Sequence, residues 1–461
     1  MQLTNFKSSA FKIPLFKSSV IILVVSQFCS CGFISYQAKP NNPAENVAAF
    51  NQKNPNSPQF YEFLALNGHA IALPIQTWDL TTLIDCALFF NPSLDVARAK
   101  LKLADAASTT AAERPLPNLN ATTSDSNQAN NDISPFGLSL GIDLPFETAN
   151  KRDIRIESAR HLTNVAQLQI AQTAWQLRYQ VTNTYYAIQY NQALVVLLTA
   201  EDALRKDVVA MYTRRVDAGM ASNVELSIVN LQLKAAIAAL NAQQQESAVL
   251  RAALASDLGL PIDIVNLMVI KADDKAILKV KTDDAVKLAL LNRIDVRIAL
   301  EQYAVAESKL KLAIAKQYPD LIVSPGYAYE FGDKVWSLGI SGLLTLLNKN
   351  RGAIKEATQL REVEAAQFMS LQANVISEAN LATAQFNKAL QIFERQKASR
   401  DAQERIAASM QARFNLGDID RVELGFNKIE SVVADKNVAL ANHELNLAAS
   451  QLENTVQRPL D

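Results

Sequence analysis

The stretch Arg215-Val216-Asp217-Ala218-Gly219 recurs in related form as Arg413-Phe414-Asn415-Leu416-Gly417, and both copies run on into Val-Glu-Leu, at 224–226 and 422–424. Each stretch interrupts a long helical pattern and places Gly where a helix needs a left-handed residue to end and turn back. The recurrence predicts two copies of a helical hairpin. Arg and Gly are common at helix ends, so the prediction depends on the shared spacing and on the repeated surroundings.

The order of motifs around the two turns also repeats. The turns lie 198 residues apart, and Arg152 and Arg351, which open the two long helical runs, lie 199 apart. The segment at 318–321 corresponds in the same way to the segment at 116–119. The sequence therefore predicts an internal tandem repeat.

We expect four parts along the chain. They are a signal peptide at 1–31, an extended N-terminal lead-in at 32–77, a first repeat at 78–280 with its tip at 215–223, and a second repeat at 281–461 with its tip at 413–423. Each repeat should contain a helix, a β-hairpin (about 118–146 in the first repeat and about 321–345 in the second) and a long helical hairpin.

The helical runs are unusually long. From about 150 to 215 no Pro or Gly occurs, and the run from about 353 to 417 is equally uninterrupted. At a rise of about 1.5 Å per residue, each predicted helix is about 100 Å long. Such a helix cannot belong to a compact globule, and the many Ala residues beside it allow other helices to approach closely.

Strict alternation marks the strands. Apolar residues alternate with small or polar residues from 136 to 144 and again from 336 to 341. This period predicts strands with one apolar and one small or polar face. Segments 119–126 and 322–329 are their expected hairpin partners.

The N-terminus has the order of a secretory signal: Lys7, Lys12 and Lys17 precede a short apolar run at 20–25 and then small and polar residues. Ser30 before Cys31 is typical of a lipoprotein cleavage site, although the two residues before Ser30 depart from that pattern. Lipidation of Cys31 and plain cleavage nearby both remain open. After this segment, several Pro and Asn residues favour an extended lead-in.

Composition excludes several classes of function. A formal charge of −1 offers no basic surface for nucleic acid, and only three His and three Cys are present in 461 residues. They are too scattered for a metal site of ordinary ligand spacing. No triad, paired-carboxylate site or phosphate loop is present, so we expect neither an enzyme nor a cofactor.

Two hairpins cannot close a membrane barrel, because single-chain barrels need at least about eight strands. We therefore expect a mainly α chain with a small β part, in which copies of the chain supply strands to one closed barrel. The long helices suit a ring of helices that continues the barrel. Such an assembly is a conduit.

The junction at 144–152 (Leu-Pro-Phe-Glu-Thr-Ala-Asn-Lys-Arg) resembles the strand-to-helix junction of the TolC-like outer-membrane efflux family, particularly its CzcC-like heavy-metal branch. The segment at 344–353 resembles the second junction. The resemblance implies a homotrimer with a twelve-stranded barrel in the bacterial outer membrane and an α-barrel in the periplasm. It also implies docking to a periplasmic adaptor (membrane fusion protein) and an inner-membrane pump, for which we expect the RND type.

By this resemblance, Arg215, Gly219, Arg413 and Gly417 belong to the periplasmic tips that meet the adaptor. An Arg suits such a contact because it donates several hydrogen bonds to carbonyls or carboxylates across an interface.

The same family places acidic residues at its closed aperture, where Asp418, Asp420 and Glu423 follow the second turn. Three chains would make rings that attract cations. Alternatively, these acids simply favour the positive end of a helix. Phe426 stands where the family commonly has a further carboxylate, so an apolar constriction is a second alternative.

The resulting interpretation is the exit duct of a tripartite efflux pump that exports heavy-metal cations or other small toxic compounds. A conduit for type I protein secretion is an alternative, and a periplasmic coiled-coil scaffold without a channel is another. The heavy-metal assignment rests on the resemblance alone, because His, Met and Cys are scarce.

Overall fold

The computed structural model describes residues 34–69, 74–127, 134–272, 284–343 and 348–459. The predicted signal peptide and Cys31 lie outside these residues. The chain divides into two units, Met1–Gln52 and Lys53–Asp461, and each is described by itself.

The lead-in expected to be extended at 32–77 contains two helices. In the first unit, α2 (Pro43–Asn51) begins after Asn42, whose side chain accepts a hydrogen bond from a backbone N–H of the first turn. In the second unit, α3 (Pro58–Leu66) begins after Ser57 in the same way. The prediction of an extended segment is wrong here, because each Pro occupies the first helical position, where it needs no N–H donor.

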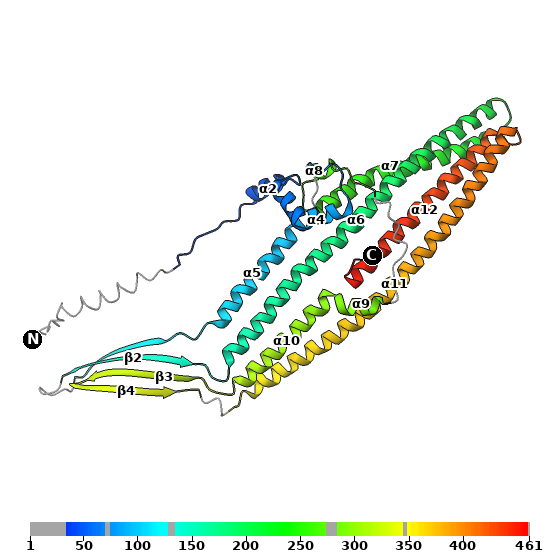
Figure 1. Ribbon diagram of the computed structural model, residues 1–461. Helices are drawn as coiled ribbons and strands as arrows, with labels where there is room; N and C mark the ends of the chain where they lie inside the picture. The colour runs from blue at the N-terminus through cyan, green and yellow to red at the C-terminus, as the bar shows by residue number, and fades with distance from the viewer. Residues whose placement is uncertain (1–33, 70–73, 128–133, 273–283, 344–347, 460–461) are drawn as a thin grey trace, which may run out of the picture. The chain divides into compact units, whose positions relative to one another are not determined.

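Four long helices dominate the second unit, and they confirm the predicted hairpins. They are α6 (Lys151–Asp217), α7 (Asn223–Leu258), α11 (Arg351–Leu416) and α12 (Arg421–Val456). Helix α6 packs against α7 and α12, and α11 packs against α12. Figure 1 shows both turns together at one end of these helices and the strands at the other end. The lengths of 67 and 66 residues for α6 and α11 agree with the uninterrupted runs in the sequence.

Shorter helices lie along the long ones. They are α4 (Leu80–Phe90), α5 (Pro92–Ala112), α8 (Ile262–Asn266), α9 (Ala285–Asn292) and α10 (Ile294–Ala315). Helices α5 and α10 both pack on α6, and α9 packs on α11 and α12. Among the described helices, none is both long and apolar enough to cross a membrane.

The strands form one antiparallel sheet in the order β1-β2-β3-β4. Their bounds are β1 (Asn118–Asp125), β2 (Phe136–Phe146), β3 (Leu321–Glu330) and β4 (Asp333–Ser341). Strands β2 and β3 pair across the two repeats, with Gly141 opposite Gly326. Strands β1 and β4 are the two edges of this sheet.

The register sorts the side chains of the sheet onto two faces. We define the apolar face by Leu119, Leu140, Ile142, Tyr327, Trp336, Leu338 and Ile340, and the small-residue face by Ser139, Gly141, Asp143, Ser324, Gly326, Ser337 and Gly339. Trp336, Leu338 and Ile340 are 81%, 70% and 71% exposed. The apolar face therefore has no cover within the described chain.

The largest core cluster lies where α3, α4, the middle of α6 and the end of α7 meet, with Phe60, Leu83, Tyr185 and Leu254 almost wholly buried. Gly259 ends α7 in this cluster with φ +68°, and a Cβ atom there would lie 2.8 Å from the Cα of Asn91. This position requires glycine for both its conformation and its surroundings.

Candidate functional site at the two helical turns

Both turns are Schellman motifs. At the first turn, the backbone N–H of Met220 donates to the Arg215 carbonyl and that of Gly219 donates to the Val216 carbonyl. At the second turn, Asp418 and Gly417 donate in the same pattern to Arg413 and Phe414. Both glycines are left-handed, with φ values of +72° and +81°. The Arg-x-x-x-Gly spacing follows from this motif. The Arg supplies the carbonyl that closes the turn, and the left-handed Gly stands four residues later.

The repeated Val-Glu-Leu tripeptide occupies the first turn of each return helix, but the caps differ. Helix α7 begins with a capping box, in which the Ser222 hydroxyl accepts from the Glu225 N–H at 3.2 Å and the Ser222 N–H donates to the Glu225 carboxylate at 2.7 Å. The Ser222 backbone and hydroxyl hold the pKa of Glu225 below its usual value. Helix α12 is capped instead by the Asp420 side chain.

Asp420 joins the two turns. Its Oδ1 accepts hydrogen bonds from the backbone N–H groups of Val422 at 2.7 Å and Glu423 at 2.9 Å. Its Oδ2 accepts from Arg215 Nη2 at 2.6 Å. The Glu423 N–H, then Arg215 and the Val422 N–H, lower the pKa of the Asp420 carboxyl. Both oxygens of Asp420 are thus already bound within the chain.

Aromatic contacts continue this link towards the helices. The Arg215 guanidinium lies over the Tyr212 ring at 5.9 Å, and that ring meets Phe426 edge-on at 6.4 Å. Phe426 is partly buried against the cluster of Val208, Val229 and Ile429. The Phe426 ring therefore packs between α6 and α12 of its own chain.

Gly425 lets α12 approach α6 closely. A Cβ atom at this position would lie 3.1 Å from Val208 Cγ2 and 3.3 Å from Met211 Cε. Further from the turns, the buried carboxylate of Glu201 on α6 pairs with Arg205 at 2.7 Å and with Lys436 of α12. Burial acts to raise the pKa of Glu201, but hydrogen bonds from Lys436 and Arg205 outweigh it and hold that pKa below its usual value.

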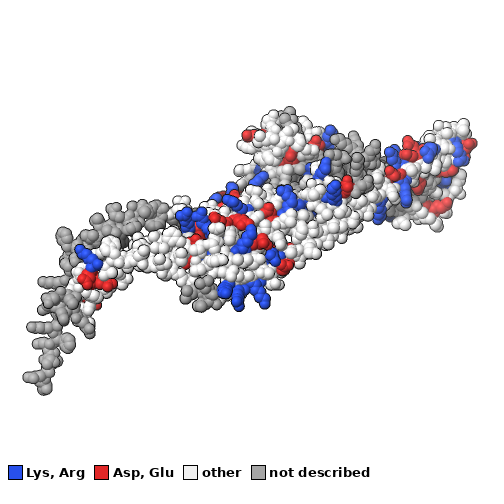
Figure 2. Space-filling view, turned by 60° about the horizontal axis from the view of Figure 1, so that its bottom comes forward, with Lys and Arg blue, Asp and Glu red and all other residues white. Residues whose placement is uncertain are grey.

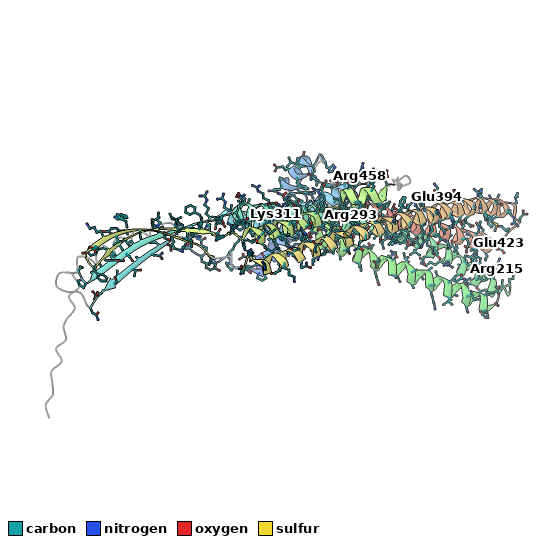
Figure 3. The ribbon with its side chains drawn as sticks, turned by 90° about the horizontal axis from the view of Figure 1, so that it is seen from below. Arg215, Arg293, Lys311, Glu394, Glu423 and Arg458 are labelled. Atoms are coloured by element: carbon teal, nitrogen blue, oxygen red, sulfur yellow. The ribbon has the colours of Figure 1, made fainter. Side chains whose placement is uncertain are left out.

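The predicted tip and aperture residues all lie at this end of the helices, and Figure 3 shows Arg215 and Glu423 there. Asp418, Glu423 and Arg413 are exposed. Within the described part of the chain, the Arg413 guanidinium donates a side-chain hydrogen bond to Met410 Sδ at 4.0 Å. In the described residues, no group of three or more His, Cys, Asp or Glu is arranged to hold a metal ion.

Sequence patterns do not single out Tyr212, Gly425 or Glu201. A Gly inside a helical run is a signal of close packing and could have indicated Gly425. Lys436 and Phe426, the α12 partners of Glu201 and Tyr212, lie more than two hundred residues away in the sequence. No local pattern reveals a contact across that separation.

Two comparisons of sequence identify similar proteins. The family model described as outer membrane efflux protein matches residues 83–260. The cobalt-zinc-cadmium resistance protein CzcC of Cupriavidus metallidurans is 23% identical over 252 residues. That alignment spans 52% of this chain and 58% of CzcC.

Solved structures share the fold. The outer-membrane channel OprN aligns with a TM-score of 0.68 at 18% identity, over 83% of this chain and 90% of that chain. The outer membrane protein VceC of Vibrio cholerae aligns with a TM-score of 0.67 at 17% identity, over 83% and 97%. The mainly helical fold with its small antiparallel sheet is confirmed.

Proposed function

We propose that this chain is a member of the outer membrane efflux protein family, whose model matches residues 83–260, and that it forms the outer-membrane exit duct of a tripartite efflux pump. Three copies close one barrel of twelve strands in the outer membrane. Their long helices form a tube in the periplasm, and the two turns of each chain face an adaptor and an inner-membrane pump of the RND type.

One observation carries this proposal: the four-stranded sheet is incomplete by itself. Strands β1 and β4 are its edges, and its apolar face is uncovered. Open edges and exposed apolar strands pair with further strands or aggregate. A closed barrel in lipid satisfies both the edge hydrogen bonds and the apolar face.

The similarity to CzcC supports metal cations or other small toxic compounds as the cargo. We place the adaptor contact at Arg215, Gly219, Arg413 and Gly417, on the exposed turns. Selectivity among metals belongs to the pump, because the described wall of this chain offers no cluster of metal ligands.

The first test is the assembly. Detergent-purified protein should have the mass of a trimer and should conduct ions in planar lipid bilayers. A monomer that is soluble without detergent and does not conduct would contradict the exit duct. It would instead support a coiled-coil scaffold.

The second test is the cargo. A strain that lacks this protein should become sensitive to divalent metals in a panel of metals and drugs, and the gene should restore tolerance. Sensitivity to drugs alone would be consistent with an exit duct but would contradict the export of metals. Adaptor capture with an ABC transporter would reject the RND pump in favour of type I secretion.

A further inference from the structure

The charges on the small-residue face of the sheet all have one sign. Among the described strand residues, this face carries Asp143, Glu330 and Asp333 and no Lys or Arg. Glu330 and Asp333 lie opposite each other in the register at the β3–β4 turn, far from the helices. Asp143 is close to the helical end of β2.

Asp143 is fixed by both neighbouring strands. Its Oδ1 accepts from the Ser324 hydroxyl of β3 at 2.6 Å, and its Oδ2 accepts from the Asn120 amide of β1 at 2.7 Å. An ionised carboxylate is an acceptor at both oxygens, which suits two donors. Both donors are neutral, and no described ion pair includes Asp143. The negative charge is held in position but is not compensated.

Small neighbours leave this charge accessible. Gly141, Gly326 and Gly339 lie on the same face. The acids just beyond the strand ends differ, because Asp320 pairs with Lys151 at 2.7 Å and Glu147 pairs with Arg155. Figure 2 likewise shows few charged residues along the visible strands between the sheet's far end and the helices.

We propose that Asp143 makes the strand-lined part of the conduit selective for cations. The inference rests on the proposed function, since the apolar face must meet lipid and the small-residue face must line the lumen. Three chains then supply three Asp143 carboxylates at one level. This level lies in the sheet and is separate from the acidic turn at the other end of the helices.

The size of a twelve-stranded barrel sets the range of the effect. Strands about 4.8 Å apart and tilted by about 40° give a radius of about 12 Å, which leaves the carboxylates about 9 Å from the axis. The Debye length is about 30 Å at 0.01 M salt and about 3 Å at 1 M. Three charges at this distance enrich a monovalent cation on the axis roughly fivefold at the lower salt and hardly at the higher.

The experiment measures the potassium-to-chloride permeability ratio of the full-length protein in planar bilayers under a salt gradient. Near 0.01 M salt, Asp143→Asn should lower this ratio at least about threefold, and near 1 M it should have no effect. Asp125→Asn is the matched control, because Asp125 lies opposite Phe136 and so on the other face. It should leave the ratio unchanged.

A second variant keeps Asp143 itself. Ser341→Lys places a positive charge on the same face near the helical end of β4, and it should lower the ratio in the same direction. Wild-type selectivity retained in either Asp143→Asn or Ser341→Lys, or lost equally in Asp125→Asn, would overturn the inference while leaving the conduit intact. A wild-type protein that conducts no ions would overturn the proposed function as well.

Discussion

The three glycines that end α6, α7 and α11 show how one conformation can serve different surroundings. Gly219, Gly259 and Gly417 all have φ between +68° and +81°. A Cβ atom at Gly219 or Gly417 would meet nothing within 4 Å. At Gly259 it would meet the backbone of Phe90 and Asn91 at 2.8 Å. The cost of an added methyl group should therefore differ among them.

Gly219→Ala should lower the free energy of unfolding by about 1–2 kcal/mol, which is the cost of a left-handed conformation for Ala. Gly259→Ala should cost a further 1–3 kcal/mol, roughly the cost of overpacking, because the start of α5 must move. Urea unfolding of the detergent-solubilised protein, followed by circular dichroism, measures both. Equal losses would mean that the crowding at Gly259 relaxes freely.

Asp420 should make the contact between the turns sensitive to acid. Its pKa is lowered in the folded chain, so its stabilising bonds are complete above the ordinary Asp value of 3.8 and are lost as pH falls through the lower folded value. Asp420→Asn should speed hydrogen exchange at the turns already at neutral pH, because it removes the ion pair with Arg215. Hydrogen exchange of peptides at the turns, corrected for intrinsic rates, measures this.

Asp418→Asn is the control for that measurement. It removes an equal charge from the same turn but leaves the cap of α12 and the bond to Arg215 in place. Faster exchange in Asp418→Asn than in Asp420→Asn would show that general charge, and not the bond to Arg215, holds the turns together.

At the scale of elements, the sheet has two chemically different faces, and adjacent residues of one strand test them. Leu338→Lys puts a charge on the apolar face and should cost about 2–4 kcal/mol if that face meets the bilayer centre. Ser337→Lys, on the small-residue face, should cost almost nothing. Yield in the outer-membrane fraction and urea unfolding in liposomes compare the two. Poor yield for Ser337→Lys alone would reverse the assignment of the faces.

The two turns are similar in backbone but different in charge. Asp418 and Asp420 directly follow the second turn, whereas residues 220–223 after the first carry no charge; Glu423 has a counterpart in Glu225. We expect joint neutralisation of the three acids to change cation conductance more than any substitution at 220–223. Because Asp420 is already bound to Arg215, neutralising Asp418 and Glu423 alone should give most of the effect.

The outcome for the turns also distinguishes the alternatives for the aperture. Equal effects at both turns would defeat the predicted asymmetry. A larger change in Phe426→Ala than in the acidic variants would favour an apolar constriction, although Phe426 packs against Tyr212 within its own chain.

Local patterns predicted the helices and strands well, because the spacing of apolar residues and the positions of Pro and Gly are local properties of the sequence. The long helices were expected from about 150 to 215 and from 353 to 417, close to the observed α6 and α11. The β2–β3 pairing is different: it joins residues such as Gly141 and Gly326, one in each repeat. Alternation specifies which residues form a strand but not which strand is its neighbour.

At the scale of the whole molecule, the predicted repeat explains much of the second unit, but the links between its halves come from side chains. Arg215 meets Asp420, and Glu201 meets Lys436, in each case between the first and second hairpins. One helix supplies the acid and the other supplies the base, so neither sequence copy shows the pair. The site is therefore only partly predictable from the repeated turns.

Helices α6 and α11 have nearly equal lengths, 67 and 66 residues, and together they set the distance between the strands and the two turns. At about 1.5 Å per residue, each spans about 100 Å from sheet to turn. The number of residues in these helices thus fixes how far from the strands the turns can contact another protein. A change in one helix alone would make the ends uneven, so this span can evolve only by matched changes in both copies.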